Sequence, residues 1–293
     1  MKPVAFDYRR AGSVEEACAL KEEDPGALFI AGGQSLMPML AMRLARPSRV
    51  IDILRVPGLD AIRLGETHVE LGATARQATV ENSRTIAETV PLLFRAMPWV
   101  GHPPTRRRGT VGGSLANADP TAEIGLVGVA LGAEVLLAEA DGARQVVPVQ
   151  EFLVAPMVTS LPPGAMVAGV RFPRRGAGRR AGAGFAEVAE RHGDYAIAAA
   201  AAEVVLDADG GCAEISAAVG GATAVPMRLA LAGLIGTRLK DAAVRSAVAA
   251  GLEGAEMMED PKASAAYRRR AAIALAAKAI GQARDEAMGA ADG

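Results

Sequence analysis

Two glycine pairs in the first half of the chain have residue types and spacing that suit a diphosphate. The first pair lies in the segment Ala31, Gly32, Gly33, Gln34, Ser35 and Leu36, and the second in the segment Thr110, Val111, Gly112, Gly113 and Ser114. Glycine lets the main chain approach a phosphate closely, and a helix that starts directly after a loop adds unpaired N–H groups. We therefore expect the two loops to hold one diphosphate from two sides. We also expect Gly113→Val to empty this site in a folded protein.

The same residues permit a purely structural interpretation. A glycine pair after a strand is often only a turn. The chain has no G-x-G-x-x-G motif and no glycine–lysine pair, which argues against a Rossmann loop and a P-loop. The basic run 106–108 either neutralises phosphates or forms a solvated loop. Glu123 either has a structural role or binds a sugar hydroxyl, and Tyr195 either stacks on a flat ring or lies at a rim.

The composition narrows the class of protein. Of the 293 residues 51% are apolar and 22% are charged, an ordinary globular balance, and the formal net charge is −1. That charge and an aromatic content of 3% argue against a nucleic-acid partner. The cysteines Cys18 and Cys212 are too few to ligate a [2Fe–2S] cluster, and the histidines lack metal-ligand spacing. Without an apolar signal region or a stretch of membrane-spanning length, we expect a soluble, cytoplasmic protein with reduced thiols.

Apolar patterns and capping residues predict the elements that position these loops. The capping box at 13–16 begins a helix, and the β-α-β order around the first loop suggests a small, mainly parallel sheet. Asp119 and Pro120 are expected as the N-cap and first residue of a helix. In this half we expect strands over 27–31, 49–53, 68–73, 133–138 and 166–172, helices over 14–23, 35–44 and within 77–99, and a polar loop over 101–109.

The second half has a different organisation. The run 173–184 is rich in proline, glycine and arginine and is expected to link two domains. The turn signal Asp-Ala-Asp-Gly-Gly at 207–211 favours a strand over the alanine-rich run 196–206, although alanine itself favours helix. The expected helices are 227–235, 240–253 and 264–288.

At these motifs the chain resembles the FAD-binding medium subunits of molybdenum hydroxylases of the xanthine dehydrogenase and carbon monoxide dehydrogenase type. Both glycine segments are similar to the family's flavin loops, and the segments 101–103, 191–196 and 264–269 match as well. The resemblance implies an α+β fold: a FAD-binding fold of the PCMH (vanillyl-alcohol oxidase-like) type in two subdomains, followed by a C-terminal domain with a small antiparallel sheet and helices. The implied divisions are residues 1–56, 57–173 and 180–293.

The resemblance also implies which residues hold FAD. The backbone of 32–35 and 112–114 binds the diphosphate, and Glu123 lies near the ribityl or ribose hydroxyls. Tyr195 shields one face of the isoalloxazine ring, and Asp194 shapes its turn. Certain relatives carry lysine at the position of Glu187, and a contact of Glu187 with FAD is left open. The implied FAD-binding residues are Ala31, Gly32, Gly33, Gln34, Ser35, Leu36, Val100, Gly101, Thr110, Gly112, Gly113, Ser114, Glu123, Val167, Asp194 and Tyr195, with no catalytic or metal-binding residue.

The function that the resemblance implies is electron transfer. A large partner subunit with a molybdenum–pterin cofactor oxidises the substrate, two [2Fe–2S] clusters in a small subunit carry the electrons, and FAD in this chain passes them to an external acceptor. The implied assembly is a dimer of such heterotrimers. Two alternatives are a stand-alone FAD-dependent reductase of the UDP-sugar reductase type and an assembly protein that has lost FAD.

Overall fold

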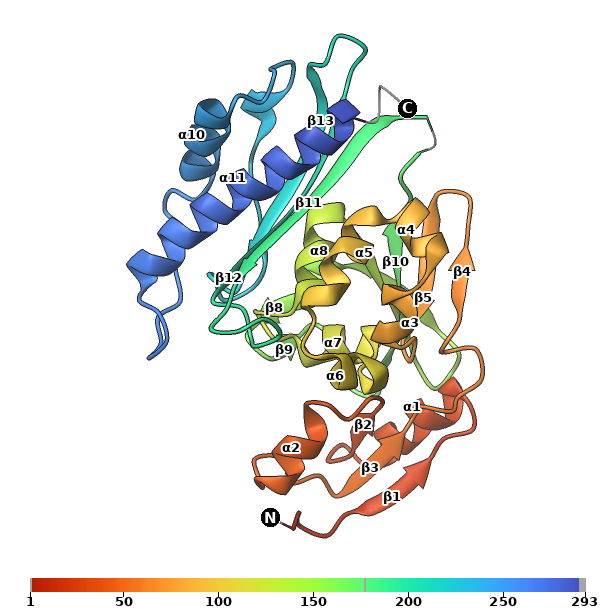
Figure 1. Ribbon diagram of the computed structural model, residues 1–293. Helices are drawn as coiled ribbons and strands as arrows, with labels where there is room; N and C mark the ends of the chain where they lie inside the picture. The colour runs from red at the N-terminus through yellow and green to blue at the C-terminus, as the bar shows by residue number, and fades with distance from the viewer. Residues whose placement is uncertain (1, 177, 290–293) are drawn as a thin grey trace.

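The computed structural model describes residues 2–176 and 178–289 and has three sheet-containing parts stacked along the molecule (Figure 1). The N-terminal part is a parallel three-stranded sheet in the order β1-β3-β2, with α1 and α2 beside it. Ser13 caps α1 by accepting from the N–H of Glu16, as the capping box predicts. The elements are β1 (Asp7–Arg10), α1 (Val14–Glu23), β2 (Leu28–Ile30), α2 (Leu36–Ala41) and β3 (Arg49–Asp52).

The middle part is an antiparallel five-stranded sheet in the order β4-β5-β10-β6-β7, and a group of short helices covers it. The strands are β4 (Ile62–Leu64), β5 (His68–Gly72), β6 (Glu134–Ala138), β7 (Arg144–Pro148) and β10 (Met166–Pro173), with a small pair β8 (Leu153–Ala155) and β9 (Val158–Thr159). The helices are α3 (Gln77–Glu81), α4 (Arg84–Thr89), α5 (Pro91–Ala96), η1 (Met97–Trp99), α6 (Pro103–Arg108), α7 (Val111–Asn117), α8 (Glu123–Leu131) and α9 (Val149–Phe152).

The C-terminal part is an antiparallel sheet in the order β11-β12-β13-β14, with α11 lying across one face (Figure 1). Glycines on β11 let this helix approach, because a Cβ atom at Gly184 would lie 1.9 Å from the carbonyl oxygen of Ala279. The alanine-rich run forms a strand, as the turn signal predicts, and alanines of α11 pack on this strand. The elements are β11 (Arg180–Val188), β12 (Ala198–Leu206), β13 (Cys212–Gly220), β14 (Met227–Arg228), η2 (Ala232–Leu234), α10 (Asp241–Gly251) and α11 (Ala265–Gly289).

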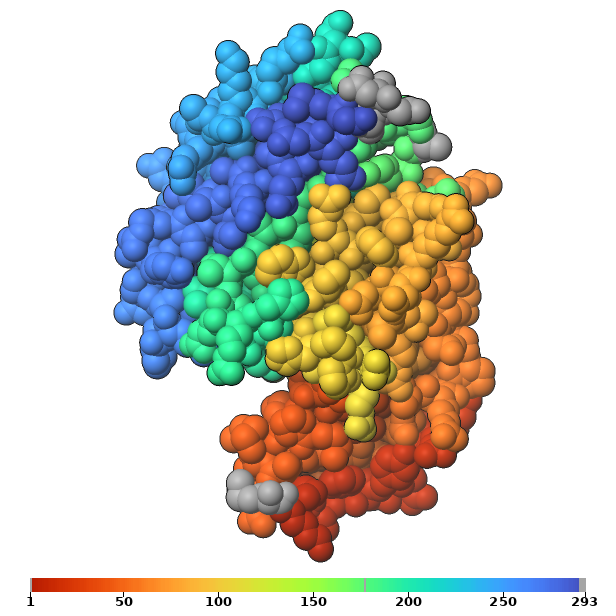
Figure 2. Space-filling view, viewed as in Figure 1, coloured from red at the N-terminus to blue at the C-terminus, as the bar shows by residue number. Residues whose placement is uncertain are grey.

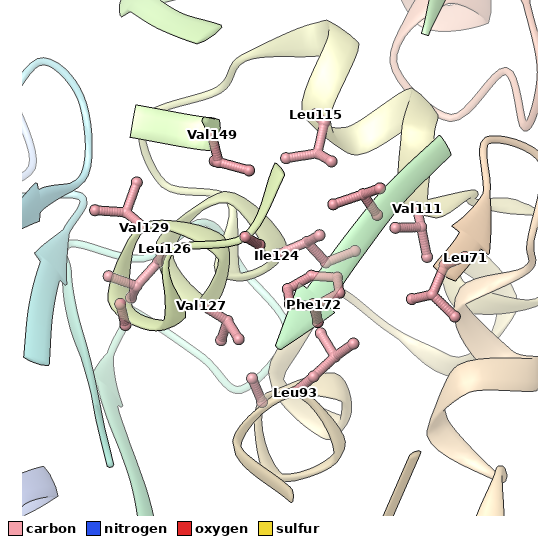
Figure 3. Close-up of a cluster of buried hydrophobic side chains, with 14 of the residues drawn as sticks. Leu71, Leu93, Val111, Leu115, Ile124, Leu126, Val127, Val129, Val149 and Phe172 are labelled. Carbon is pink, nitrogen blue, oxygen red and sulfur yellow. The ribbon is translucent and has the colours of Figure 1, made fainter. Parts of the chain in front are cut away.

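One continuous apolar core fixes the helices that follow the second glycine loop. Val111 and Leu115 of α7, Ile124 of α8 and Leu93 of α5 belong to the same buried cluster as Phe172 of β10 and lie around it (Figure 3). All five side chains are at most 1% exposed. Because burial of such side chains stabilises by about 1.5–3 kcal/mol each, the starts of α7 and α8 are held rigidly.

Several sequence-based expectations are wrong. The expected loop 101–109 contains α6, and residues 227–235 form a short strand and a 3-10 turn rather than a helix. Asp119 does not cap α8: its carboxylate accepts from the N–H of Thr121, and α8 begins at Glu123. The interdomain link is shorter than 173–184, because β10 extends to Pro173 and β11 starts at Arg180. Residue 177 of this link and the chain end 290–293 lie outside the described residues.

Among residues 2–176 and 178–289, none of the helices combines the length and the apolar character needed to cross a membrane.

Candidate functional site

The first glycine loop offers a row of free backbone donors. It lies between the end of β2 at Ile30 and the start of α2 at Leu36, and Gly33 has a φ of +69°, which favours glycine. Within the described residues, no hydrogen bond takes the N–H groups of residues 32–35. Consecutive N–H groups without acceptors at a helix start are an anion-binding arrangement.

The structure brings the two glycine loops into direct contact. A Cβ atom at Gly32 would lie 2.3 Å from the carbonyl oxygen of Arg108 and 2.9 Å from the Cα atom of Gly109. The backbone of Arg76 pairs with Thr110, and its guanidinium donates to the carbonyl of Arg108. Only a glycine at position 32 allows the first loop to pack on the residues just before the second.

The second loop differs from the expectation in its hydrogen bonds. The N–H of Gly112 donates to the carbonyl of Ala73 at 3.0 Å, and that of Gly113 donates to the hydroxyl of Thr110 at 3.1 Å. The N–H of Ser114 donates to the carbonyl of Thr110. These three donors are engaged inside the protein, so the free surface of this loop is the exposed Gly113 with the hydroxyl of the partly exposed Ser114.

This geometry changes what a substitution at Gly113 tests. A Cβ atom there would lie 2.7 Å from Oγ1 of Thr110, so Gly113→Val displaces the N-cap of α7 and also fills the space above the loop. We expect this variant to lose FAD binding and about 1 kcal/mol of stability. FAD titration and urea unfolding measure the two effects. Gly113→Ala is the control, because its methyl group meets the Thr110 cap in the same way but fills less of the space.

Arg106 has neither of the roles that the sequence suggested. Its side chain is 8% exposed and forms an ion pair with Glu81 through Nε (2.7 Å) and Nη2 (2.8 Å). Nη1 donates to the carbonyls of Val100 (3.1 Å) and Gly101 (2.8 Å). Arg106 therefore holds the turn at 100–101 in place, whereas Arg107 and Arg108 are exposed.

We expect Arg106→Met to lower the free energy of unfolding by about 3 kcal/mol. The change leaves Glu81 and two carbonyl groups without their donor. Urea unfolding measures the loss, with the exposed Arg107→Met as control. Equal stabilities of the two variants would contradict the role assigned to Arg106.

The C-terminal part closes over the turn at Val100–Gly101. The ring of Trp99 lies 5.0 Å from that of His192 and 6.0 Å from that of Phe185. Gly193, with a φ of +89°, packs on the ring of His102 and the carbonyl of Gly101. The loop after β11, which carries Asp194 and Tyr195, is thereby fixed beside this turn.

Tyr195 is 67% exposed, and the N–H of Asp194 closes a turn on the carbonyl of Arg191. The space-filling view shows an indentation between α2 (orange) and the loop after β11 (green), next to the helices of the second glycine loop (Figure 2). Val167, in contrast, is buried at 5% exposure beside a register shift in β10.

The carboxyl groups of Glu123 and Glu187 in this region have strongly raised pKa values. Burial raises the pKa of Glu123 to about 7, with a further increase from Asp119, and Arg106 opposes it. Burial and the nearby charge of Glu123 raise the pKa of Glu187 to about 8. Burial also raises the pKa of Tyr195, with contributions from Asp119 and Glu123. Titratable groups with such shifts in a cleft are typical of functional sites.

Sequence reasoning did not identify every residue of this region. Trp99, Arg76 and the structural use of Arg106 were missed, because their contacts join segments that are distant in the sequence or, for Arg106, bury a residue of an apparently solvated run. The sequence shows the basic residue Arg106 close to the Gly-His-Pro segment, but the spacing of residues does not predict Glu81 as its partner.

The residues present fit a bound flavin dinucleotide. Four free N–H groups suit a diphosphate, and both carboxylate oxygens of Glu187 are buried without a hydrogen-bond partner. Buried polar atoms without partners are rare in native proteins, and a polar ligand would satisfy them. Within the described residues no group of three or more His, Cys, Asp or Glu side chains is placed to hold a metal ion.

Comparison with known proteins identifies two domains. Residues 4–175 match the FAD binding domain in molybdopterin dehydrogenase, and residues 183–283 match the CO dehydrogenase flavoprotein C-terminal domain. The chain is 42% identical over 271 residues to a subunit of the 6-hydroxypseudooxynicotine dehydrogenase complex of Paenarthrobacter nicotinovorans, covering 92% of this chain and 90% of that subunit. It is 32% identical to the carbon monoxide dehydrogenase medium chain of Afipia carboxidovorans over 98% and 99% of the two chains.

Solved structures have the same fold. Quinoline 2-oxidoreductase from Pseudomonas putida 86 superposes with a TM-score of 0.92 at 32% identity, covering 98% of this chain and 100% of that chain. Carbon monoxide dehydrogenase from Hydrogenophaga pseudoflava gives a TM-score of 0.92 at 30% identity, with coverages of 98% and 99%. The α+β architecture expected from the resemblance is confirmed.

Proposed function

The chain belongs to the family of FAD-binding medium subunits of molybdenum hydroxylases, and we propose that it carries electrons from [2Fe–2S] clusters of a small partner subunit to an external acceptor through bound FAD. The large partner subunit, with its molybdenum–pterin cofactor, is the place of substrate oxidation. The proposal includes a dimer of heterotrimers in the cytoplasm and the domain divisions 1–56, 57–173 and 180–293.

The free N–H groups of residues 32–35 are the observation that carries this proposal. They belong to a loop that packs on Arg108 and Gly109, just before the second glycine loop, where Gly32 leaves no room for a side chain. In the proposed complex the backbone of Ala31–Leu36 and the hydroxyls of Thr110 and Ser114 bind the diphosphate. Val100, Gly101 and the backbone of Val167 line the pocket, and Glu123 binds ribityl or ribose hydroxyls.

The flavin lies between the turn at 100–101 and the Asp194–Tyr195 loop, where Tyr195 covers one face of the ring. FAD supplies the redox chemistry, since it stores electrons and releases them to a separate acceptor. The residues of this chain orient it and exclude water. No side chain is required as a nucleophile or as a metal ligand.

Exposed apolar side chains beside the indentation suit the docking of the small subunit. They lie on α2 and the following segment and on the β8–β9 pair, which Figure 1 places on the same side of the molecule. These side chains are Met37, Met42, Leu44, Val154, Met157 and Val158. Apolar patches of this kind mark protein interfaces.

In the proposed complex the large subunit binds the substrate. The relatives of this chain are named for nicotine hydroxylation, caffeine, glyceraldehyde and carbon monoxide dehydrogenation. We propose that the complex oxidises an N-heterocycle, an aldehyde or carbon monoxide, and the acceptor is a quinone, oxygen, NAD or another carrier.

Purification of the tagged chain from its native host tests the proposal. We expect a yellow complex that contains FAD, molybdenum, iron and two further chains. A monomer that oxidises NADPH by itself supports the stand-alone reductase. A folded, colourless chain that takes up no FAD supports the assembly protein instead.

A further inference from the structure

Glu187 lies on the inner face of the C-terminal sheet, directed at the FAD-binding part. In the sheet register Glu187 pairs with Ala199, which pairs with Gly220. Directly paired residues of antiparallel strands share one face. Ala199 is 1% exposed and belongs to the core formed with the FAD-binding part, as does Phe185, two residues before Glu187. The side chain of Glu187 therefore points into the candidate site.

Glu187, Ala199 and Gly220 form a row across the sheet, and the start of α8 lies beside the Gly220 end of this row. The N–H of Gly221 donates to the carbonyl of Pro120 at 2.9 Å, and a Cβ atom at Gly220 would lie 3.4 Å from Leu126 of α8. Glu123, the first residue of α8, is 7% exposed, and its carboxyl group accepts a hydrogen bond from the N–H of its own backbone. Two carboxyl groups from different domains thus enter one poorly solvated space.

Neither carboxyl group has the cationic partner that a buried carboxylate requires. Both oxygens of Glu187 are buried without a donor, and among the ion pairs of the described residues none involves Glu123 or Glu187. An isolated buried carboxylate is costly, and two of them side by side add repulsion.

We propose that Glu123 and Glu187 share one proton and that the protonated carboxyl group donates a hydrogen bond to an acceptor atom of FAD. The ligand class is an uncharged heterocyclic carbonyl, a ring nitrogen or a ribityl oxygen. This inference rests on the proposed function, and it makes Glu187 a cofactor-binding residue through its neutral form.

The electrostatic surroundings support one shared proton. Burial raises the pKa of Glu187 to about 8 and that of Glu123 to about 7, and the charge of Glu123 contributes to the first shift. The other ionisable groups that face the pair are Asp119, which disfavours a second charge, Arg106, which favours the charge of Glu123, and Tyr195. Such a pair loses its protons in two steps that belong to both groups.

FAD affinity of the full chain, measured between about pH 6 and about pH 9.5, tests the proposal. We expect the Kd to rise above a pH of about 8 by up to about tenfold per pH unit, because the donor is lost. Glu187→Gln keeps an N–H donor, so it should bind FAD within about threefold of the wild type at neutral pH and lose this pH dependence. Glu190→Gln is the control, because Glu190 is exposed and near in sequence.

The flavin-free chain provides a second readout. The infrared difference spectrum between about pH 7.5 and about pH 9.5 should contain the carbonyl stretch of one buried carboxylic acid, and Glu187→Gln should remove it. The folded chain holds protons that the unfolded chain releases above the ordinary value of 4.5, so its free energy of unfolding should fall as the pH rises towards about 8. Glu187→Gln should flatten this slope, and Glu190→Gln should not.

The outcomes separate this inference from the proposed function. FAD binding that is independent of pH, without a carboxylic acid signal, overturns the shared proton and leaves the FAD subunit intact. A carboxylic acid signal in a chain that binds FAD at no pH overturns the donor role together with the proposed function.

Discussion

Ser35→Pro should weaken FAD binding by about tenfold to a hundredfold while the flavin-free chain stays folded. Proline has no N–H, and the N–H of Ser35 has no acceptor within the described residues, so the fold loses no hydrogen bond. Ser35 has a φ of −96° just before α2, so a proline with a φ of about −65° requires a modest rotation of the backbone there. The expected loss corresponds to one charge-assisted hydrogen bond to a phosphate oxygen.

A matched variant and a matched ligand isolate this effect. Ser35→Ala keeps the N–H and removes the hydroxyl, so it should bind FAD more tightly than Ser35→Pro. Riboflavin has no phosphate, and its affinity should be the same in both variants. Calorimetric titration gives these constants, and thermal unfolding reports on the fold. An equal loss of riboflavin affinity in Ser35→Pro would show that the proline distorts the pocket and that the N–H does not bind the diphosphate.

Sequence signals predicted the structure correctly where neighbouring residues determine it. The capping box at Ser13, the strand that ends before Gly32 and the turn after β12 depend on neighbouring residues, and all three are present. Strand over helix in β12 was also correct, because the turn signal outweighs the helix preference of alanine once a second strand pairs with it.

The errors fall where distant segments decide the local structure. The segment 103–108 looked like a solvated loop, but its Arg106 is buried against Glu81 and stabilises a helical turn. Asp119 was expected as a cap, yet it closes its own turn on Thr121, and the tie between Gly221 and Pro120 holds that turn before α8. The short strand at Met227–Arg228 exists because β13 offers it a partner.

In the candidate site too, features set by neighbouring residues could be predicted from the sequence, and features set by distant segments could not. The first loop and its free N–H groups follow from glycines beside a strand end and a helix start, which the sequence shows. The engaged donors of the second loop depend on Ala73, a residue of another segment. The position of Glu187 opposite Glu123 requires the sheet register and the packing of two domains, and no spacing in the sequence encodes either.

Arg268→Met should lower the free energy of unfolding by about 4 kcal/mol and also weaken FAD binding. Arg268 of α11 is 2% exposed. Its Nη1 donates to the carbonyls of Ile197 (2.6 Å) and Gly221 (2.7 Å), and Nη2 pairs with Asp260 at 2.6 Å. Without the guanidinium two buried carbonyl groups lose their donor, which costs about 1–3 kcal/mol each.

FAD binding should weaken because the two carbonyl groups that Arg268 binds lie in segments next to the proposed flavin site. Ile197 is two residues after Tyr195, and Gly221 is tied to Pro120 before α8, so one guanidinium positions both the Tyr195 loop and the start of the Glu123 helix. We expect Arg268→Lys to recover part of the stability but less of the affinity, because an ammonium group cannot reproduce the planar geometry. Arg270→Met, an exposed neighbour on α11, is the control for both urea unfolding and FAD titration. If Arg268→Met loses stability yet binds FAD with unchanged affinity and unchanged visible circular dichroism, Arg268 only supports the domain and does not position the flavin site.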